Sequence, residues 1–244
     1  MENRYKESFI NLLKNTENSE LIGSGYPNAN ILIIGQEKSN DEPDDKNTIS
    51  YTKDWNALLC GEKKAIYSYP SDLKDKVGHT WNKYQKLHDA IFPEYSGYNI
   101  GILNHAMRIF STEMNIGISK RNSDARKNPN FKENLKQRKE MYLNSEFIQQ
   151  FPVTILACSR YFKATNKVNE IRDIFGVDFI GERDGKFLYS KGNWFAIYKN
   201  AAKTKLVIHT RQLSVNVDNQ LLKDMGSIIR QFLQENKIQL SSVD

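Results

Sequence analysis

Three short apolar runs constrain the fold of this chain most strongly. They are ILII (Ile31–Ile34), PVTILAC (Pro152–Cys158) and TKLVIHT (Thr204–Thr210). Apolar runs of strand length are typical of strands that are covered on both faces, as in a parallel sheet. Segments with helical periodicity separate the three runs. Apolar strands that alternate with helices predict an α/β fold built on a mostly parallel sheet.

The expected helices are spread along the whole chain. Apolar residues at helical spacing predict helices over residues 4–21, 80–92, 130–151, 161–176 and 218–236. We also expect a helix that ends near Ala106, a strand over Met107–Met114, and small antiparallel strands within 178–200. No segment has linker composition, so we expect one domain over 1–244. A long loop at about 36–79, with a short helix inside it, is of a length usually found at binding sites.

Composition sets broad limits on location and partners. The net charge of +6 and the pI near 9.1 permit an anionic partner without requiring one. No apolar run approaches the roughly 18 residues of a membrane span, and the N-terminal segment lacks the pattern of a signal peptide. Cys60 and Cys158 form no metal-ligand pattern. We therefore expect a cytoplasmic protein with reduced thiols and no membrane association. We also expect a monomer, and the chemistry described below needs no metal or organic cofactor.

Several familiar catalytic motifs are absent from the sequence. There is no GxxxxGK[ST] phosphate loop, no GxSxG elbow, and no HExxH or CxxC pair. The GSGYPN segment lacks the third glycine of a dinucleotide fingerprint and precedes a strand. The acids at positions 41, 42, 44 and 45 are interpreted as a solvated loop, in preference to a cation site.

Polar residues follow the predicted strands at their carboxyl ends, where open parallel sheets bind ligands. Gly35, Gln36 and Glu37 follow the first run, and His209 stands at the exit of the last. Glu37 is equally well interpreted as a solvated acid or as a group that stabilises a cation. Asn115 follows the strand predicted over 107–114. An asparagine offers both a donor and an acceptor, so it can read the edge of a base, although asparagines more often cap turns.

These residues resemble the motifs of the uracil-DNA glycosylase superfamily. In that family the first strand leads into Gly-Gln-Asp-Pro-Tyr-His, and the last core strand leads into His-Pro-Ser-Pro-Leu-Ser. The corresponding segments here are GQEKSN, from Gly35, and HTRQLS, from His209. The similarity in element order covers roughly residues 20–235. The resemblance implies a three-layer α/β/α sandwich with a central, mostly parallel four-stranded sheet.

The resemblance also implies roles for individual residues. Glu37 stands where the family has its water-activating aspartate, and His209 stands where a histidine stabilises the leaving base. Substrate binding is implied for Gly35, Gln36 and Asn115, with Asn104 as a rival to Asn115 for reading the base, and we expect Lys38 and Ser39 to belong to the same pocket. DNA contacts are implied for Leu213, as the apolar wedge that fills the vacated base stack, and for Ser214, and we expect Arg211 beside them to hold a phosphate.

Departures from the family motif bear on the substrate. Lys38-Ser39 replaces the Pro-Tyr pair, whose tyrosine closes the family's uracil pocket against larger pyrimidines. We therefore expect a DNA glycosylase that hydrolyses the N-glycosidic bond of a flipped-out uracil or an enlarged, modified pyrimidine, in duplex or single-stranded DNA, and leaves an abasic site. An enlarged substrate would suit base excision in antiviral defence against phage with modified DNA.

Two further features concern contact with DNA. Eight basic residues between Lys120 and Lys139, together with Lys199–Lys205, are expected to form a DNA-facing rim, with a solvated basic helix as the alternative. Tyr51, Trp55 and Trp81 are candidates for stacking on the base. The competing functions are a non-catalytic DNA-binding protein on the same fold and a hydrolase of small nucleotide N-glycosides.

Overall fold

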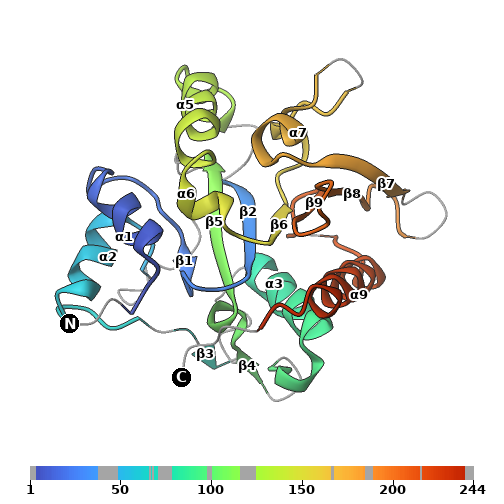
Figure 1. Cartoon of the computed structure of the whole chain (residues 1–244), viewed down its shortest axis with the longest axis horizontal. Helices are drawn as coiled ribbons and strands as arrows, with labels where there is room; N and C mark the ends of the chain where they lie inside the picture. Colours follow the sequence, from blue (N-terminus) through green and yellow to red (C-terminus); the bar gives the residue numbers. More distant parts are fainter. Residues whose placement is uncertain are drawn as a thin grey trace.

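The chain folds around one seven-stranded sheet (Figure 1). The computed structural model describes residues 4–37, 49–65, 67, 69–70, 79–97, 101–115, 125–165, 168–184, 189–214 and 216–239. The strands of the sheet are β1 (Ser24–Gly25), β2 (Ile31–Glu37), β5 (Ile109–Asn115), β6 (Val153–Leu156), β7 (Asp178–Asp184), β8 (Trp194–Lys199) and β9 (Leu206–Thr210). A separate pair, β3 (Tyr69–Pro70) and β4 (Ile102–Leu103), is antiparallel.

The sheet is mixed, with a parallel centre and antiparallel edges. Its order is β1-β5-β2-β6-β9-β8-β7. The four central strands, β5, β2, β6 and β9, run parallel, whereas β1 and the β8–β7 pair are antiparallel to their neighbours. The predicted α/β class is confirmed. The expected count of four strands is wrong, because β1, β7 and β8 extend the sheet at its two edges.

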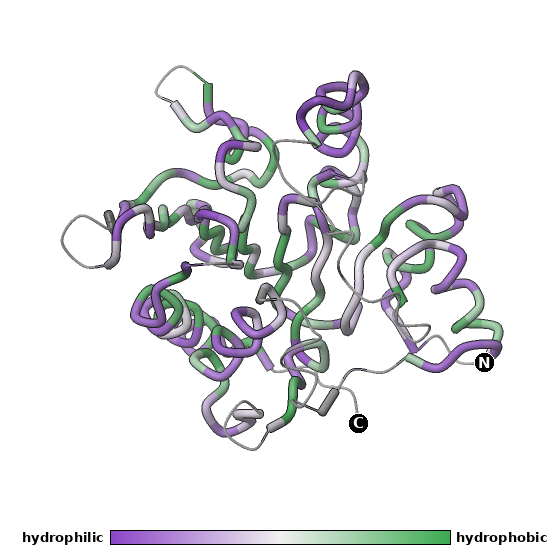
Figure 2. The backbone as a smooth tube through the Cα atoms, turned by 180° about the vertical axis from the view of Figure 1, so that it is seen from behind, coloured by the Kyte–Doolittle hydropathy of each residue, from purple (hydrophilic) through white to green (hydrophobic). Residues whose placement is uncertain are grey.

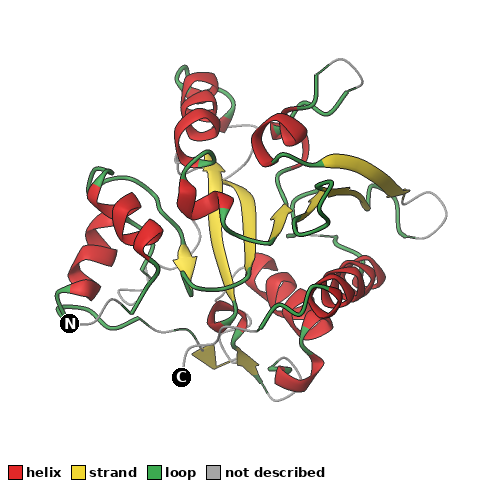
Figure 3. Cartoon of the chain, viewed as in Figure 1, coloured by secondary structure: helices red, strands yellow, loops and turns green. Residues whose placement is uncertain are grey.

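Helices cover both faces of the sheet (Figure 3). The described α-helices are α1 (Glu7–Lys14), α2 (Thr52–Leu59), α3 (His79–Ile91), α5 (Phe131–Gln137), α6 (Glu146–Gln149), α7 (Glu170–Phe175) and α9 (Asn219–Glu235). Helices α3 and α9 pack together over one face. The remaining helices contribute to the core on the other face. None of the helices in the described ranges is both long enough and apolar enough to cross a bilayer.

Strand alternation divides the core into these two halves. Leu32 and Ile34 of β2 belong to the core with α1 and α2, whereas Ile31 and Ile33 belong to the core with α3 and α9. The four residues have no exposed surface. This is the pattern of a strand buried on both faces, and the apolar stretches gather in the middle of the molecule in Figure 2.

The last helix shows how local sequence sets an element's bounds. The side chain of Asp218 accepts a hydrogen bond from the backbone N–H of Gln220 and so caps the first turn. Seven buried residues then recur at helical spacing along α9. The prediction for this helix is confirmed, as is that for α3. Helix α7 is shorter than expected and ends at Gly176, which adopts a left-handed φ of 64°.

Two predicted helices are wrong in detail. The segment before β5 forms β4 and a 3-10 turn, η4 (His105–Met107), because Gln85 Oε1 accepts hydrogen bonds from the N–H groups of Asn104 and His105 at 2.7 and 2.9 Å. The helix expected over 130–151 is divided into α5, the π-helix η5 (Arg138–Tyr142) and α6. Ser145 starts α6 by accepting a bond from the N–H of Ile148.

Candidate functional site at the carboxyl ends of the central strands

The ends of β2 and β9 converge on one turn that follows β6. Gln36, near the end of β2, donates from Nε2 to the carbonyl oxygen of Cys158 at 3.3 Å. His209 of β9 bonds through Nε2 to the carbonyl oxygen of Ser159 at 2.7 Å. The strands bring them there because Ile34, Leu156 and His209 lie in register across three neighbouring strands. Both residues are nearly buried.

His209 lies in an apolar, aromatic environment. The ring of Trp194 contacts it edge-on, with centroids 5.0 Å apart, and the ring centroid of Phe162 lies 6.3 Å away. Burial lowers the pKa of His209 below its ordinary value, and the bond to the Ser159 carbonyl opposes this shift. Since a carbonyl only accepts, Nε2 carries the proton. The lowered pKa favours the neutral ring, with its proton on Nε2.

Ser159 has an unusual backbone conformation. Its φ is 51°, in the left-handed region that non-glycine residues rarely adopt. The carbonyl oxygen of this residue accepts the hydrogen bond from His209. Such conformations cost about 1–3 kcal/mol and gather at functional sites. The sequence offered no signal for this residue, because nothing in CSRY distinguishes an ordinary turn from a strained one.

The end of β5 supplies a second group of polar residues. The backbone of Glu37 pairs with Asn115, and the pair before it in the same register is Gly35 with Glu113. Asn115 is buried. The side chain of Glu37 and both Lys38 and Ser39 lie outside the described residues, so the predicted roles of these three stay predictions. The structure places Asn115 beside the backbone of Glu37, at the carboxyl ends of adjacent strands.

Gly35 makes room for the carboxylate of Glu113, a residue outside the two sequence motifs. A Cβ at position 35 would lie 2.1 Å from Oε2 of Glu113, so the Glu113 carboxylate packs directly on the glycine. The space that this glycine leaves open is therefore filled by a side chain of the protein itself. The signal for Glu113 was present, since it lies two residues before Asn115 in the predicted strand and so shares its face.

The two groups approach the sheet edge from opposite faces. Gln36 and His209 continue the alternation of Ile34 and Val207, which face the core with α1 and α2. Glu113 and Asn115 have the alternate positions, on the side of α3. A ligand that contacts both groups must therefore lie beyond the strand ends and across the edge of the sheet.

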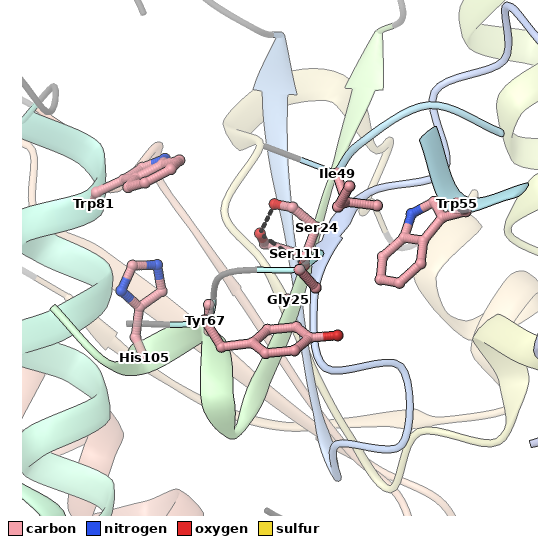
Figure 4. Close-up of a pocket in the computed structure, with 10 residues that line it drawn as sticks. Ser24, Gly25, Ile49, Trp55, Tyr67, Trp81, His105 and Ser111 are labelled. Atoms are coloured by element: carbon pink, nitrogen blue, oxygen red, sulfur yellow. Dashed lines mark hydrogen bonds between the residues drawn. The ribbon is translucent and has the colours of Figure 1, made fainter. Parts of the chain in front are cut away.

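A cleft runs along the α3 side of β5. Its lining includes Ser24 of β1, Thr80, Trp81 and Tyr84 of α3, and Ser111 and Glu113 of β5. The hydroxyl oxygens of Ser24 and Ser111 are 3.2 Å apart. Figure 4 shows an adjoining pocket, in which Trp81 and His105 lie on one side of this serine pair and Trp55 on the other. Trp81 is partly exposed, and its ring contacts that of His105 edge-on, with centroids 5.9 Å apart.

Three predicted site residues lie away from this edge. Asn104 precedes β5, at the amino end of the sheet, where its side chain accepts from Gln85 and donates to the carbonyl of Tyr95. Leu213 has no exposed surface and packs in the core with α9. Trp55 is also fully buried and donates to the carbonyl of Gly23. Asn104 thus lies at the opposite end of β5 from Asn115, and neither Leu213 nor Trp55 has the exposed surface that a wedge or a stacking ring needs.

The other residues predicted to contact DNA are less constrained. Arg211 is partly buried, and its guanidinium donates to the carbonyls of Gly192 and Asn216 at 3.4 Å. Ser214 is partly buried in the loop after β9, and Tyr51 is partly buried at the start of α2. The predicted roles of these three residues stay predictions.

The expected basic rim is smaller than the sequence suggested. Arg138 is buried and donates to the carbonyls of Glu113 and Leu21 and to the hydroxyl of Thr112. Lys139 pairs with Glu170 at 2.7 Å. Lys205 donates to Gln149, and burial lowers its pKa to about 8. Within the described part of 120–139 the exposed basic residues are Arg126, Lys127, Lys132 and Lys136, and in 199–205 Lys203 is exposed. Lys120 and Arg121 lie outside the described residues.

Comparison with known proteins adds no assignment. No protein-family model, no curated protein and no solved structure matches the chain. Within the described ranges, no group of three or more His, Cys, Asp or Glu side chains is arranged to hold a metal ion. The functional interpretation therefore rests on the geometry of the strand ends and on the sequence motifs.

Proposed function

We propose that the chain is a DNA glycosylase that hydrolyses the N-glycosidic bond of an extruded uracil or modified pyrimidine. The observation that carries this proposal is the convergence of the two motifs. Gln36 and His209 donate to consecutive carbonyl groups of one turn, although they are far apart in the chain. The parallel order β5-β2-β6-β9 brings Asn115 to the same edge. The family resemblance assigns the reaction to residues that follow these strands, and this supports the proposal.

The chemistry needs two opposite stabilisations. Breaking the bond between sugar and base develops positive charge on the sugar and negative charge on the base. A carboxylate near the sugar stabilises the cation and orients water, and this is the role proposed for Glu37. A hydrogen bond to a base carbonyl stabilises the departing anion, and the neutral ring of His209 is a donor suited to it.

His209 reaches the base by exchanging partners. Its Nε2–H is bonded to the Ser159 carbonyl in this structure, so binding of the base replaces that acceptor with a carbonyl of the pyrimidine. The left-handed conformation of Ser159 supports this step, because a strained residue gains from a change in its backbone. Asn115, an amide with both a donor and an acceptor, is proposed to read the Watson–Crick edge.

Strand-cleavage assays test the proposal directly. Oligonucleotides that contain uracil or a modified pyrimidine are incubated with the protein and then treated with alkali, which breaks the strand at abasic sites. We expect breaks with the wild type and far fewer with Glu37→Gln and with His209→Ala. Absence of breaks on every base, with the wild type equal to both variants, would overturn the proposal.

One observation favours a second function, a non-catalytic DNA-binding protein. The donor of His209 is already satisfied by a backbone carbonyl, as for a structural histidine. This alternative predicts salt-sensitive DNA binding that survives both substitutions, with no abasic product. Measuring binding and product formation on the same variants separates the two functions.

A further inference from the structure

A groove between two helical segments carries an inference about a protein partner. It runs between α1 and the segment from α5 to α6, on the face of the sheet that these helices cover, and its volume is about 570 Å³. Ligand pockets usually measure about 300–1,000 Å³, so this groove has room for several side chains of an occupant. Gln36, Asn115 and His209 are not among its lining residues, so the groove is separate from the proposed catalytic site.

The groove is negatively charged, although the whole chain carries a charge of +6. Its lining includes Glu17, Glu20 and Glu146, and among the described lining residues Arg138 alone is basic. Arg138 is buried and donates to two backbone carbonyls and to the Thr112 hydroxyl. In the described part of the chain the exposed carboxylates of Glu17 and Glu146 have no ion pair. The groove therefore repels phosphate groups and favours a cationic occupant.

Apolar side chains lie beside these carboxylates. Met141 is 75% exposed, which is unusual for a large apolar residue, and Leu12 lines the opposite wall from α1. Tyr142 and Phe147, both buried, also belong to the lining. Met141 is part of the π-helix η5. Such helical segments are frequent at functional sites, and exposed methionines are frequent on surfaces that bind peptides. The groove thus offers apolar contacts together with unpaired carboxylates.

The hydroxyl of Ser8 lacks a hydrogen-bond partner. Ser8 is 8% exposed and lines the groove from α1, and its Oγ makes no hydrogen bond to any described residue. Buried hydroxyl groups are normally hydrogen-bonded. An unpaired one on the wall of an open groove indicates an occupant that brings a polar group to this point.

We infer that this groove docks a basic, amphipathic helix of a partner protein. The described lining residues lie in helices and turns and not in strands, so the groove has no edge to which an extended peptide adds as a strand. A helix presents apolar residues at i, i+3, i+4 and i+7 on one side. That side packs on Leu12, Met141 and Phe147, and its flanking lysines or arginines pair with Glu17 and Glu146. The inference does not rest on the glycosylase function.

Two synthetic peptides test the inference on the full chain. The probe is a fluorescently labelled helical peptide of leucine and lysine, with the leucines at i, i+3, i+4 and i+7, and the control peptide has the same composition in scrambled order. Fluorescence anisotropy should show that the probe binds at least about 10-fold more tightly, because the scrambled peptide has no continuous apolar side to bury. Binding of the two peptides with equal affinity would overturn the inference.

Variants of exposed residues locate the bound peptide. Glu17→Gln/Glu146→Gln should weaken binding of the probe by about 2- to 30-fold, the contribution of two exposed ion pairs. Met141→Lys should weaken it by more than about 10-fold, because an apolar contact is replaced by a repelling charge. The matched control Glu182→Gln/Glu235→Gln removes two exposed carboxylates outside the groove and should leave binding unchanged. Equal losses in the two double variants would contradict docking in this groove.

Two further measurements distinguish other occupants. Spermidine probes a small polycation, and sedimentation of the chain alone probes a second copy of the protein. We expect spermidine at the concentration of the peptide to leave the peptide bound, and the chain to sediment identically with and without Met141→Lys. Displacement by spermidine, or a dimer that Met141→Lys dissociates, would overturn the inference. Absence of peptide binding by the wild type would overturn it as well, whatever the strand-cleavage assays show.

Discussion

Gln36 and His209 donate hydrogen bonds to the consecutive carbonyl oxygens of Cys158 and Ser159. The turn after β6 thereby ties the end of β2 to the end of β9. Both donors are nearly buried, so the bonds are shielded from water, which makes leaving either acceptor unsatisfied costly. Cys158 and Ser159 are adjacent, so both motif residues depend on the conformation of this one turn.

Replacing His209 should separate catalysis from stability. His209→Gln removes the imidazole but keeps an N–H donor, so we expect a modest loss of unfolding free energy, about 1 kcal/mol. Activity should fall by about 100- to 1000-fold, as when a donor to a developing anion is lost. Thermal unfolding and kcat measured on the same samples check both values. Equal activity of variant and wild type would show that His209 is structural.

His105 should make the protein sensitive to acid. Burial lowers the pKa of His105 to about 3, against about 6.5 in the unfolded chain. Between these values the unfolded state binds more protons, so stability is complete above about pH 6.5 and is lost as the pH falls toward 3. The melting temperature of His105→Gln should fall less steeply with pH over this range. Parallel slopes for variant and wild type would contradict the assignment.

Leu213 should contribute to stability and not to DNA affinity. Because the side chain has no exposed surface, Leu213→Ala leaves a cavity and should cost about 2–5 kcal/mol of unfolding free energy. Denaturant unfolding measures this cost, and DNA titration of the folded variant measures affinity. A stable variant with weakened DNA binding would instead support the wedge expected from the motif.

We expect Lys132 and Lys136, the exposed basic residues of α5, to bind the phosphate backbone of DNA. The double variant Lys132→Ala/Lys136→Ala should weaken DNA binding and reduce the slope of log K against log salt by about 0.9 for each phosphate that the protein no longer neutralises. Arg138→Met, in which the buried arginine is removed, should lower stability and leave the salt slope unchanged. An unchanged slope in the double variant would place the DNA elsewhere.

The sequence predicted the strands of the parallel centre because their signal is local. Uninterrupted apolar runs at β2, β6 and β9 indicate burial on both faces without any knowledge of their neighbours. The edge strand β1 was not predicted, because it has only two residues and so shows no periodicity. The break of the helix over 130–151 was also missed, since it depends on Arg138 bonding to residues distant in the chain.

The candidate site was predictable only where motif and strand end coincide. Gly35, Gln36 and His209 were identified because they lie at the ends of apolar runs. Glu113 had only an indirect signal, its place two residues before Asn115, and its packing on Gly35 is known from the structure alone. Ser159 had no signal, because it is recognised by its backbone dihedral angle. Leu213 is buried in the core with α9, and Arg138 is buried against β5. The sequence pattern alone does not show that these elements pack against the two residues.

The most direct test of the central claim is mass spectrometric detection of the free base released from modified-pyrimidine DNA. The account predicts that the wild type releases an intact pyrimidine and leaves an unbroken strand with an abasic site, whereas Glu37→Gln and His209→Ala release far less. Detection of no free base from any DNA, under conditions in which the wild type binds that DNA, would contradict the account.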